Sequence, residues 1–283
     1  MVTSAPRLGF SFLYFGPRLD EALHRWFPRL VHHGYAGAEL PVVGATPAQL
    51  TATRKALAAN GLAATGVGFA TVEADPLSPD AAVRRAAVDH LVRLAEHTAA
   101  LGGDVLAGPI HSAYGRFSEQ PPTADEFQRC VEVLRAAGER SQPLGVRLAV
   151  EPLNRFECYF LNTAAACSAL VRAVGHPNVV GALDTHHAHI EEGDLADAIR
   201  AMRGTLGHVQ LSENHRGTPG TGQVDFARVL QALRAIDYRG WLVVEAFSRH
   251  DPAFGSALRI WRALDHGPED VLAAGSRLLP RPS

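Results

Sequence analysis

The stretch VRLAVEPL, residues 146–153, predicts a β-strand that ends beside a carboxylate. Its aliphatic residues alternate with others along the strand, so that Val150 and Glu151 point to opposite faces. Similar β-rich runs recur at regular intervals along the whole chain. They are LGFSFLYF (8–15), YAGAEL (35–40), LAATGVGFA (62–70), DVLAGPI (104–110), VVGALDT (179–185), LGHVQLSE (206–213) and WLVVEAF (241–247).

Amphipathic helical stretches lie between these runs. In TPAQLTATRKALAANG (46–61), Thr46 is suited to cap a helix and Pro47 to occupy its first turn. Eight β–α units without a linker predict a single (β/α)8 TIM barrel, one domain that spans residues 1–283. The alternative, a doubly wound open sheet, often has a glycine-rich phosphate-binding turn after its first strand. The segment FGPRLDE (15–21) does not supply that turn.

The composition limits the classes of partner. Hydrophobic residues make up 47% of the chain and charged residues 20%, and the formal net charge is −2. The chain therefore lacks the basic footprint expected of a protein that binds nucleic acid. No apolar run is long enough for a membrane span or a secretory signal, and the three cysteines have no metal-ligand spacing. The sequence predicts a cytoplasmic protein that contacts neither nucleic acid nor membranes.

Four consecutive predicted strands carry an oxygen-bearing side chain near their C-terminal end: Glu151, Asp184, Gln210 and Glu245. Strand alternation points the first three into the barrel. Glu245 shares its face with Trp241 and other large apolar residues, and we expect it inside because a carboxylate gains nothing by packing against a helix. The C-terminal strand ends of such a barrel meet at its mouth, where catalytic residues lie.

Carboxylates that converge in this way would repel one another, and their pKa values would rise. A divalent cation between them removes the repulsion, and carboxylate and amide oxygens suit Mg²⁺ or Mn²⁺. A single carboxylate at a strand end is more often a loop cap or a surface charge, but four such residues in register favour a metal site. His208 shares the face of Gln210 two residues deeper in the strand, and we expect it in the core.

Four segments carry a resemblance to a known family: EPLNRFECYFLNT (151–163), LDTHHAHIEEGD (183–194), GHVQLSENHRGTPGTGQVDF (207–226) and VVEAF (243–247). In the same order, they resemble the ketose 3-epimerases, the D-tagatose/D-psicose 3-epimerase branch of the xylose isomerase-like TIM barrels. The segment GPIHSAYGR (108–116) extends the likeness. The resemblance implies that fold and an isomerase that epimerises C3 of a free ketose through an enediolate.

The resemblance also implies roles for the four residues at the strand ends. Glu151 and Glu245 would ligate the metal and serve as the acid/base pair, and Asp184 would be the third ligand. The implied cofactor is a divalent cation, Mn²⁺ or Mg²⁺, with Co²⁺ as a further candidate. The implied assembly is a homodimer or a homotetramer.

Further residues are implied to hold the oxygens of a small-molecule sugar substrate. Glu157 is the last residue of EPLNRFE, His187 lies three residues after Asp184, and Arg216 lies in ENHRG. His111 follows the fourth predicted strand, where members of the family contact their substrate.

Gln210 departs from the epimerases, which have a metal-ligating histidine at this position. A glutamine here resembles the hydroxypyruvate isomerase branch of the superfamily, so an aldose–ketose isomerase is an alternative function. An endonuclease IV-type nuclease shares the spacing of Asp184 and His187, but it would need more zinc ligands and a basic face. A non-catalytic sugar-binding barrel is a third alternative, and the retained carboxylates and Arg216 argue against it.

Overall fold

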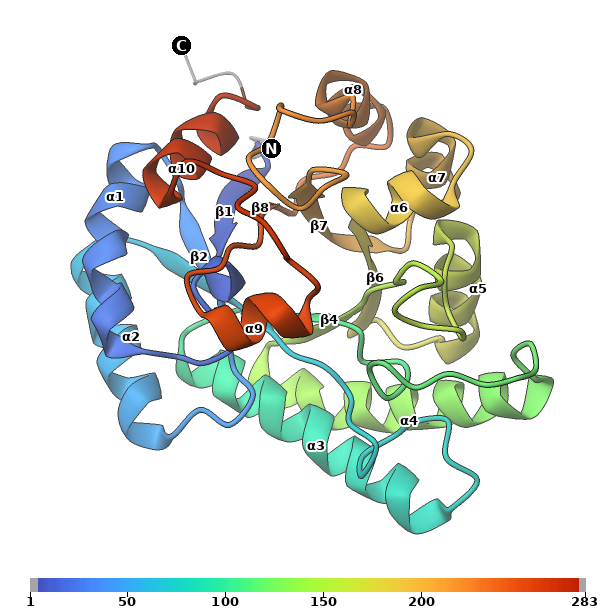
Figure 1. Cartoon of the computed structure of the whole chain (residues 1–283). Helices are drawn as coiled ribbons and strands as arrows, with labels where there is room; N and C mark the ends of the chain where they lie inside the picture. Colours follow the sequence, from blue (N-terminus) through green and yellow to red (C-terminus); the bar gives the residue numbers. More distant parts are fainter. Residues whose placement is uncertain (1–4, 280–283) are drawn as a thin grey trace.

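Eight parallel strands close into a barrel in the order of the sequence, with β8 paired to β1. The structure, a computed structural model, describes residues 5–279, and Figure 1 shows helices around the ring of strands. The strands are β1 Arg7–Ser11, β2 Gly37–Pro41, β3 Ala63–Val67, β4 Val105–Gly108, β5 Arg147–Val150, β6 Val179–Asp184, β7 Leu206–Ser212 and β8 Trp241–Glu245. Each overlaps one predicted run. The predicted barrel is confirmed, and the open sheet is wrong.

The helices alternate with the strands, as the sequence predicts. They are α1 Phe27–His32, α2 Pro47–Ala59, α3 Ala81–Ala100, α4 Ala124–Ser141, α5 Ala164–Val174, α6 Thr185–Glu191, α7 Leu195–Ala201, α8 Phe226–Ala235, α9 Pro252–Ala257 and α10 Pro268–Ser276. The predicted start of α2 is confirmed, because the Thr46 hydroxyl accepts a hydrogen bond from the Gln49 backbone. The Gln49 side chain accepts one from the Thr46 backbone in return. This reciprocal pair satisfies two donors that a helix start otherwise leaves unpaired.

A small apolar cluster fills the barrel interior below the mouth. Its members are Val105, Ala107, Ala149, Ala182, Trp241 and Val243. It includes Trp241 and Val243, the two residues within β8 that share a face with Glu245, so the orientation predicted for β8 is correct. The other face of each strand packs against the helices in a larger core. Strand alternation therefore predicted which side chains reach the interior.

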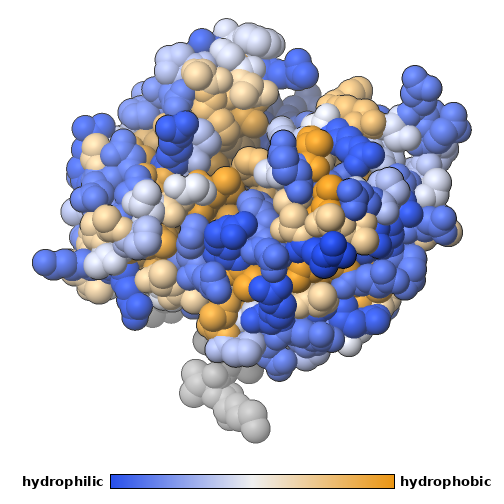
Figure 2. Space-filling model, turned by 90° about the horizontal axis from the view of Figure 1, so that it is seen from below, coloured by the Kyte–Doolittle hydropathy of each residue, from blue (hydrophilic) through white to orange (hydrophobic). Residues whose placement is uncertain are grey.

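The segments that follow β5, β7 and β8 gather at the C-terminal end of the barrel, where they line a common cavity. In Figure 1 the short helix α9 lies in front of the strands. The long helices α3 and α4 pack side by side along the lower edge of the barrel in this view. The face in Figure 2 is mostly hydrophilic, with smaller apolar patches between. Within residues 5–279, no helix is long and apolar enough to cross a membrane.

Candidate active site

The four predicted strand-end residues meet at the barrel mouth, and each is buried. Glu151 directly follows β5, Asp184 ends β6, Gln210 lies in β7 and Glu245 ends β8. Their exposed fractions are 4%, 1%, 1% and 2%. Single oxygens of Glu151 and Asp184 and a ring nitrogen of His187 all lie within 4.8 Å of one another. Glu245 is not part of that trio.

Glu245 joins the cluster through its neighbours. Its carboxyl group lies within hydrogen-bonding reach of Asp184. The Gln210 amide donates to its Oε1 over 3.2 Å, and the Arg216 guanidinium donates to its Oε2. The same guanidinium lies 3.3 Å from Asp184. One arginine therefore balances part of the negative charge at the centre of the site.

Arg216 is held in place by its loop as well as by these ion pairs. Its backbone has a φ of 64°, a left-handed conformation that is uncommon for a residue with a side chain. The fully buried Glu213 stabilises this loop by accepting hydrogen bonds from the backbone of Asn214, Gly220 and Val224. The guanidinium also lies over the Phe247 ring, 4.6 Å from its centroid. The loop after β7 thus presents a fixed cation to the site.

The electrostatics of the cluster favour a further positive charge. Burial raises the pKa of Glu151 well above its ordinary value, and the neighbouring Asp184 raises it further. Burial likewise raises the pKa values of Asp184 and Glu245, although Arg216 opposes both shifts. Ionised carboxylates in this position are therefore short of positive charge, which a bound cation would supply.

The donor set also fits a hard divalent cation. The amide oxygen Oε1 of Gln210 is buried and has no hydrogen-bond partner among the described residues. Unpaired buried acceptors are uncommon because their desolvation costs free energy. Three carboxylates and one unpaired amide oxygen are the oxygen ligands that Mg²⁺ and Mn²⁺ prefer. The residues present thus fit such an ion.

His187 and Glu157 lie beside the carboxylate cluster. The Asn154 backbone N–H donates to Nδ1 of His187 over 3.0 Å. Nε2 of the same ring lies 3.6 Å from Glu151 and 2.7 Å from the Arg216 guanidinium, which is a donor. Glu157 accepts hydrogen bonds from Asn154 and Tyr114. These groups offer both donors and acceptors to a polyol.

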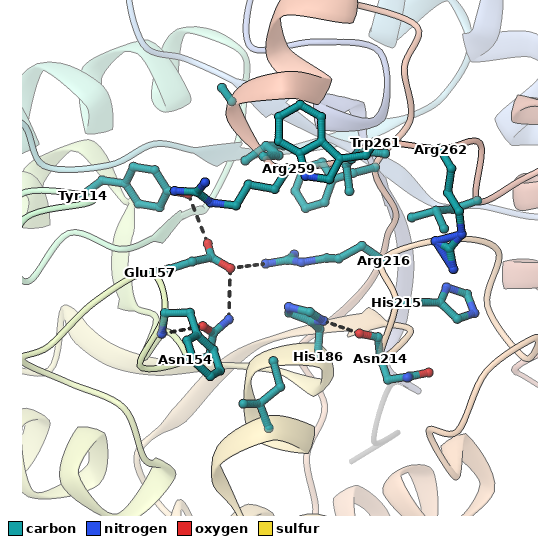
Figure 3. A pocket seen from close by; sticks show the side chains of 17 residues that line it. Tyr114, Asn154, Glu157, His186, Asn214, His215, Arg216, Arg259, Trp261 and Arg262 are labelled. Carbon is teal, nitrogen blue, oxygen red and sulfur yellow. Dashed lines mark hydrogen bonds and ion pairs between the residues drawn. The ribbon is translucent and has the colours of Figure 1, made fainter.

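A cavity of about 470 Å³ opens above these residues. Figure 3 shows Glu157 and Arg216 pointing toward one another across it, with their nearest charged atoms 4.0 Å apart. Asn154 and Tyr114 bind Glu157 on one side, while Arg259 and Trp261 lie on another wall. Three of the predicted substrate contacts, Glu157, His187 and Arg216, are therefore brought together at or beside one cavity.

His111 is not brought to this cavity. It is fully buried, its ring lies against Phe160 with centroids 5.8 Å apart, and it contacts the Ser112 hydroxyl at 2.9 Å. Like His187, it does not line the cavity. Its role as a substrate contact stays a prediction.

Two buried acids that hold the site together are not among the residues predicted from the sequence. Glu213 stabilises the Arg216 loop, and Glu39 on β2 accepts hydrogen bonds from His208 and Gln210. The alternation in β2 was a signal for Glu39, because Ala38 and Leu40 take the helix-facing positions on either side of it. Glu213 had no such signal, since it follows the last residue of β7. His208 is fully buried, as expected.

Comparison with known proteins finds the same barrel fold, and its relatives come from the family that the sequence resembles. A D-psicose 3-epimerase of Agrobacterium fabrum is 36% identical over 262 residues, which cover 90% of this chain and 87% of that protein. A ketose 3-epimerase of Arthrobacter globiformis is 34% identical and covers 82% of this chain and 80% of its own length. The crystal structure of a D-allulose 3-epimerase from Methylomonas sp. in complex with D-allulose superposes with a TM-score of 0.89 at 29% identity, covering 97% of this chain and 96% of that chain.

These relatives confirm the predicted resemblance to the ketose 3-epimerases. A sequence model of the xylose isomerase-like TIM barrel matches residues 27–277, which span every strand from β2 to β8. The chain belongs to the xylose isomerase-like TIM-barrel family.

Proposed function

We propose that this protein is a divalent-metal-dependent epimerase that inverts C3 of a free ketose. One observation carries the proposal: three buried carboxyl groups meet the unpaired amide oxygen of Gln210 at the mouth of the barrel. Relatives named as ketose 3-epimerases support the choice of substrate class.

Glu151, Asp184, Gln210 and Glu245 would hold the cation. When bound, it would act as a Lewis acid on the oxygens of the ketose and so favour loss of the neighbouring proton. The raised pKa values of the three carboxyl groups support this assignment, because each ionised carboxylate gains from a nearby positive charge.

Glu151 and Glu245 would move the proton. They stand at the C-terminal ends of β5 and β8, which two other strands separate in the barrel, so they approach the cavity from different sides. One carboxylate removes the proton from C3 and the other returns one to the opposite face, which inverts the carbon. Burial makes both carboxylates stronger bases than an exposed glutamate, and a stronger base suits removal of a proton from carbon.

Glu157, His187 and Arg216 would hold the substrate. The guanidinium of Arg216 is a donor, Glu157 is an acceptor, and the His187 ring lies beside the guanidinium. A ketose has hydroxyl groups that can satisfy all three, and fixing them would place C3 between the two glutamates. The resemblance adds His111 to this set, and its ring is fully buried in this structure.

Deuterium incorporation tests the reaction directly. The protein is stripped with a chelator, reloaded with Mn²⁺ and incubated with a panel of free ketoses in deuterated water. We expect a new epimer with deuterium only at C3. In Glu151→Gln and Glu245→Gln, with bound metal measured, each variant should exchange the C3 proton of only one of the two epimers. No exchange with any ketose would refute proton transfer as the function.

The second candidate is an aldose–ketose isomerase of the hydroxypyruvate isomerase type. Gln210 favours it, because that branch has a glutamine at the same position. The two functions differ in where the proton is delivered, so deuterium at C1 of the ketose or of hydroxypyruvate would select the isomerase.

We also propose Mn²⁺ or Mg²⁺ as the cation, with Co²⁺ as a substitute, and a cytoplasmic homodimer or homotetramer as the working form. The all-oxygen donor set supports the harder ions. Activity after reloading with each metal tests the choice of cation. Sedimentation velocity tests the oligomeric state, and cell fractionation tests the location.

A further inference from the structure

A buried hydrogen-bond network lies directly behind Gln210, and the proposed reaction does not use it. Glu39 and His208 are both 0% exposed. Oε2 of Glu39 accepts a hydrogen bond from Nε2 of His208 over 2.7 Å, and Oε1 accepts one from Nε2 of Gln210 over 3.1 Å. A carboxylate withdrawn from water in this way needs such partners.

The network spans the barrel interior. Strands β8 and β1 lie between β7, which carries Gln210, and β2, which carries Glu39. On β1, Gly9 faces the interior, since a Cβ added there would lie 3.2 Å from a methyl group of Val243. A larger residue at Gly9 would crowd this part of the interior. The Glu39 contact is thus a product of barrel closure.

Hydrogen bonding determines which end of the Gln210 amide is left free. Its NH₂ group donates to Oε1 of Glu39 over 3.1 Å and to Oε1 of Glu245 over 3.2 Å. Turning the amide by 180° would place its oxygen against both carboxylates and break both bonds. The unpaired oxygen is therefore the only end available to another ligand.

A glutamine ligand needs this help because it does not orient itself. The terminal torsion of the side chain is broad and two-fold, so the oxygen and the NH₂ group exchange places at little cost. Only the oxygen can ligate a hard cation, because the NH₂ group is a donor. Glu245 takes one of its hydrogens, but Glu245 is itself a proposed ligand and base. Glu39 is neither a proposed ligand nor a proposed base.

We propose that Glu39, held by His208, is a positioning residue that turns the amide oxygen of Gln210 toward the bound divalent cation. The inference rests on the proposed function, in which Gln210 is a ligand. His208 contributes by occupying the second oxygen of Glu39. Its Nδ1 has no partner among the described residues, so the ring with its proton on Nε2 satisfies the contact.

A metal-binding cycle tests the inference. Glu39→Met removes both acceptor oxygens at a similar side-chain length. Chelator-stripped proteins are titrated with Mn²⁺ in a calorimeter, and circular dichroism checks that each is folded. We expect Glu39→Met to lower the affinity roughly 10- to 100-fold, the usual effect of losing a partner of a metal ligand. In a Gln210→Ala background, the same change should cost almost nothing more, because no amide is left to orient.

Equal losses of affinity in both backgrounds would mean that Glu39 acts through its charge or through the fold, and would overturn the inference. The matched control is Asp104→Asn, which neutralises a carboxylate bound to Arg7 and Trp241 at the other end of the barrel. It should leave the affinity unchanged.

If Glu39→Met does not fold, Glu39→Leu enters the same cycle. It also removes both acceptor oxygens, so it too should lower the affinity. Wild-type affinity in the folded variant would overturn the inference. A wild-type protein that binds no Mn²⁺ would instead refute the proposed function.

Discussion

Replacing Glu213 by glutamine should loosen the loop that carries Arg216. The carboxylate is fully buried, and its Oε1 accepts from the backbone N–H groups of Asn214 at 3.0 Å and Val224 at 2.9 Å. Its Oε2 accepts from Gly220 at 2.9 Å. In the best orientation, Glu213→Gln keeps the first two bonds and sets its NH₂ group against the Gly220 N–H.

The charge-assisted hydrogen bond from Gly220 is then lost, and the buried NH₂ group of the new side chain is left without a partner. Together these should lower the free energy of unfolding by about 2 to 3 kcal/mol. A loss of this size should reduce the melting temperature by roughly 5 °C in a chain of this length. Because Arg216 moves with the loop, we also expect a higher KM for the ketose.

Thermal melts, amide hydrogen exchange at Gly220 and Val224 and steady-state kinetics measure the three effects. The control is Asp225→Asn, at the exposed N-cap of α8, where asparagine caps as well as aspartate. A Glu213→Gln protein with wild-type melting and wild-type exchange at Gly220 would refute the argument that this carboxylate stabilises the loop.

Three other changes have defined outcomes. Gly222→Ala would place a Cβ 2.2 Å from Oδ1 of Asn214 and 2.6 Å from Oε1 of Glu213, and so would displace the loop that carries Arg216. We therefore expect kcat/KM for the ketose to fall about a hundredfold, and unchanged kinetics would contradict this. Burial lowers the pKa of His111 from 6.5 to about 3. Because the folded pKa is below the unfolded pKa, the stability that the neutral ring contributes is complete above pH 6.5 and is lost as the pH falls toward 3. Urea titrations at pH 7.5 and 5 should show that the free energy of unfolding falls less between these two pH values in His111→Phe than in the wild type. Chelator-stripped protein should gain about 2.7 kcal/mol of unfolding free energy when the free Mn²⁺ concentration reaches 100 times Kd, measured by urea melts, and no gain would argue against a metal site.

Local pattern was enough to predict the architecture and the orientation of the strand ends. Alternation in β5, β6 and β7 depends only on chain neighbours, since successive side chains of a strand point to opposite faces. It therefore placed Glu151, Asp184 and Gln210 in the interior before any tertiary contact was known. Glu245 followed from the cost of packing a carboxylate against a helix.

The resemblance to ketose 3-epimerases brought Glu157, His187 and Arg216 into the same hypothesis. The structure places Glu157 and Arg216 on the wall of one cavity, with the His187 ring beside Arg216. It also suggested His111, whose ring is fully buried against Phe160. A motif records the order of residues, whereas the direction of a loop side chain depends on the packing around it.

The sequence by itself determined the barrel and the set of inward-facing, oxygen-bearing side chains, because both depend on periodicity along the chain. Only the tertiary structure decided what surrounds those side chains. His208 and Glu39 are 169 residues apart and meet because eight strands close into a ring. Arg216 reaches Asp184 and Glu245 because the loop after β7 folds over the mouth. Such contacts depend on chain closure, and no local pattern contains that information.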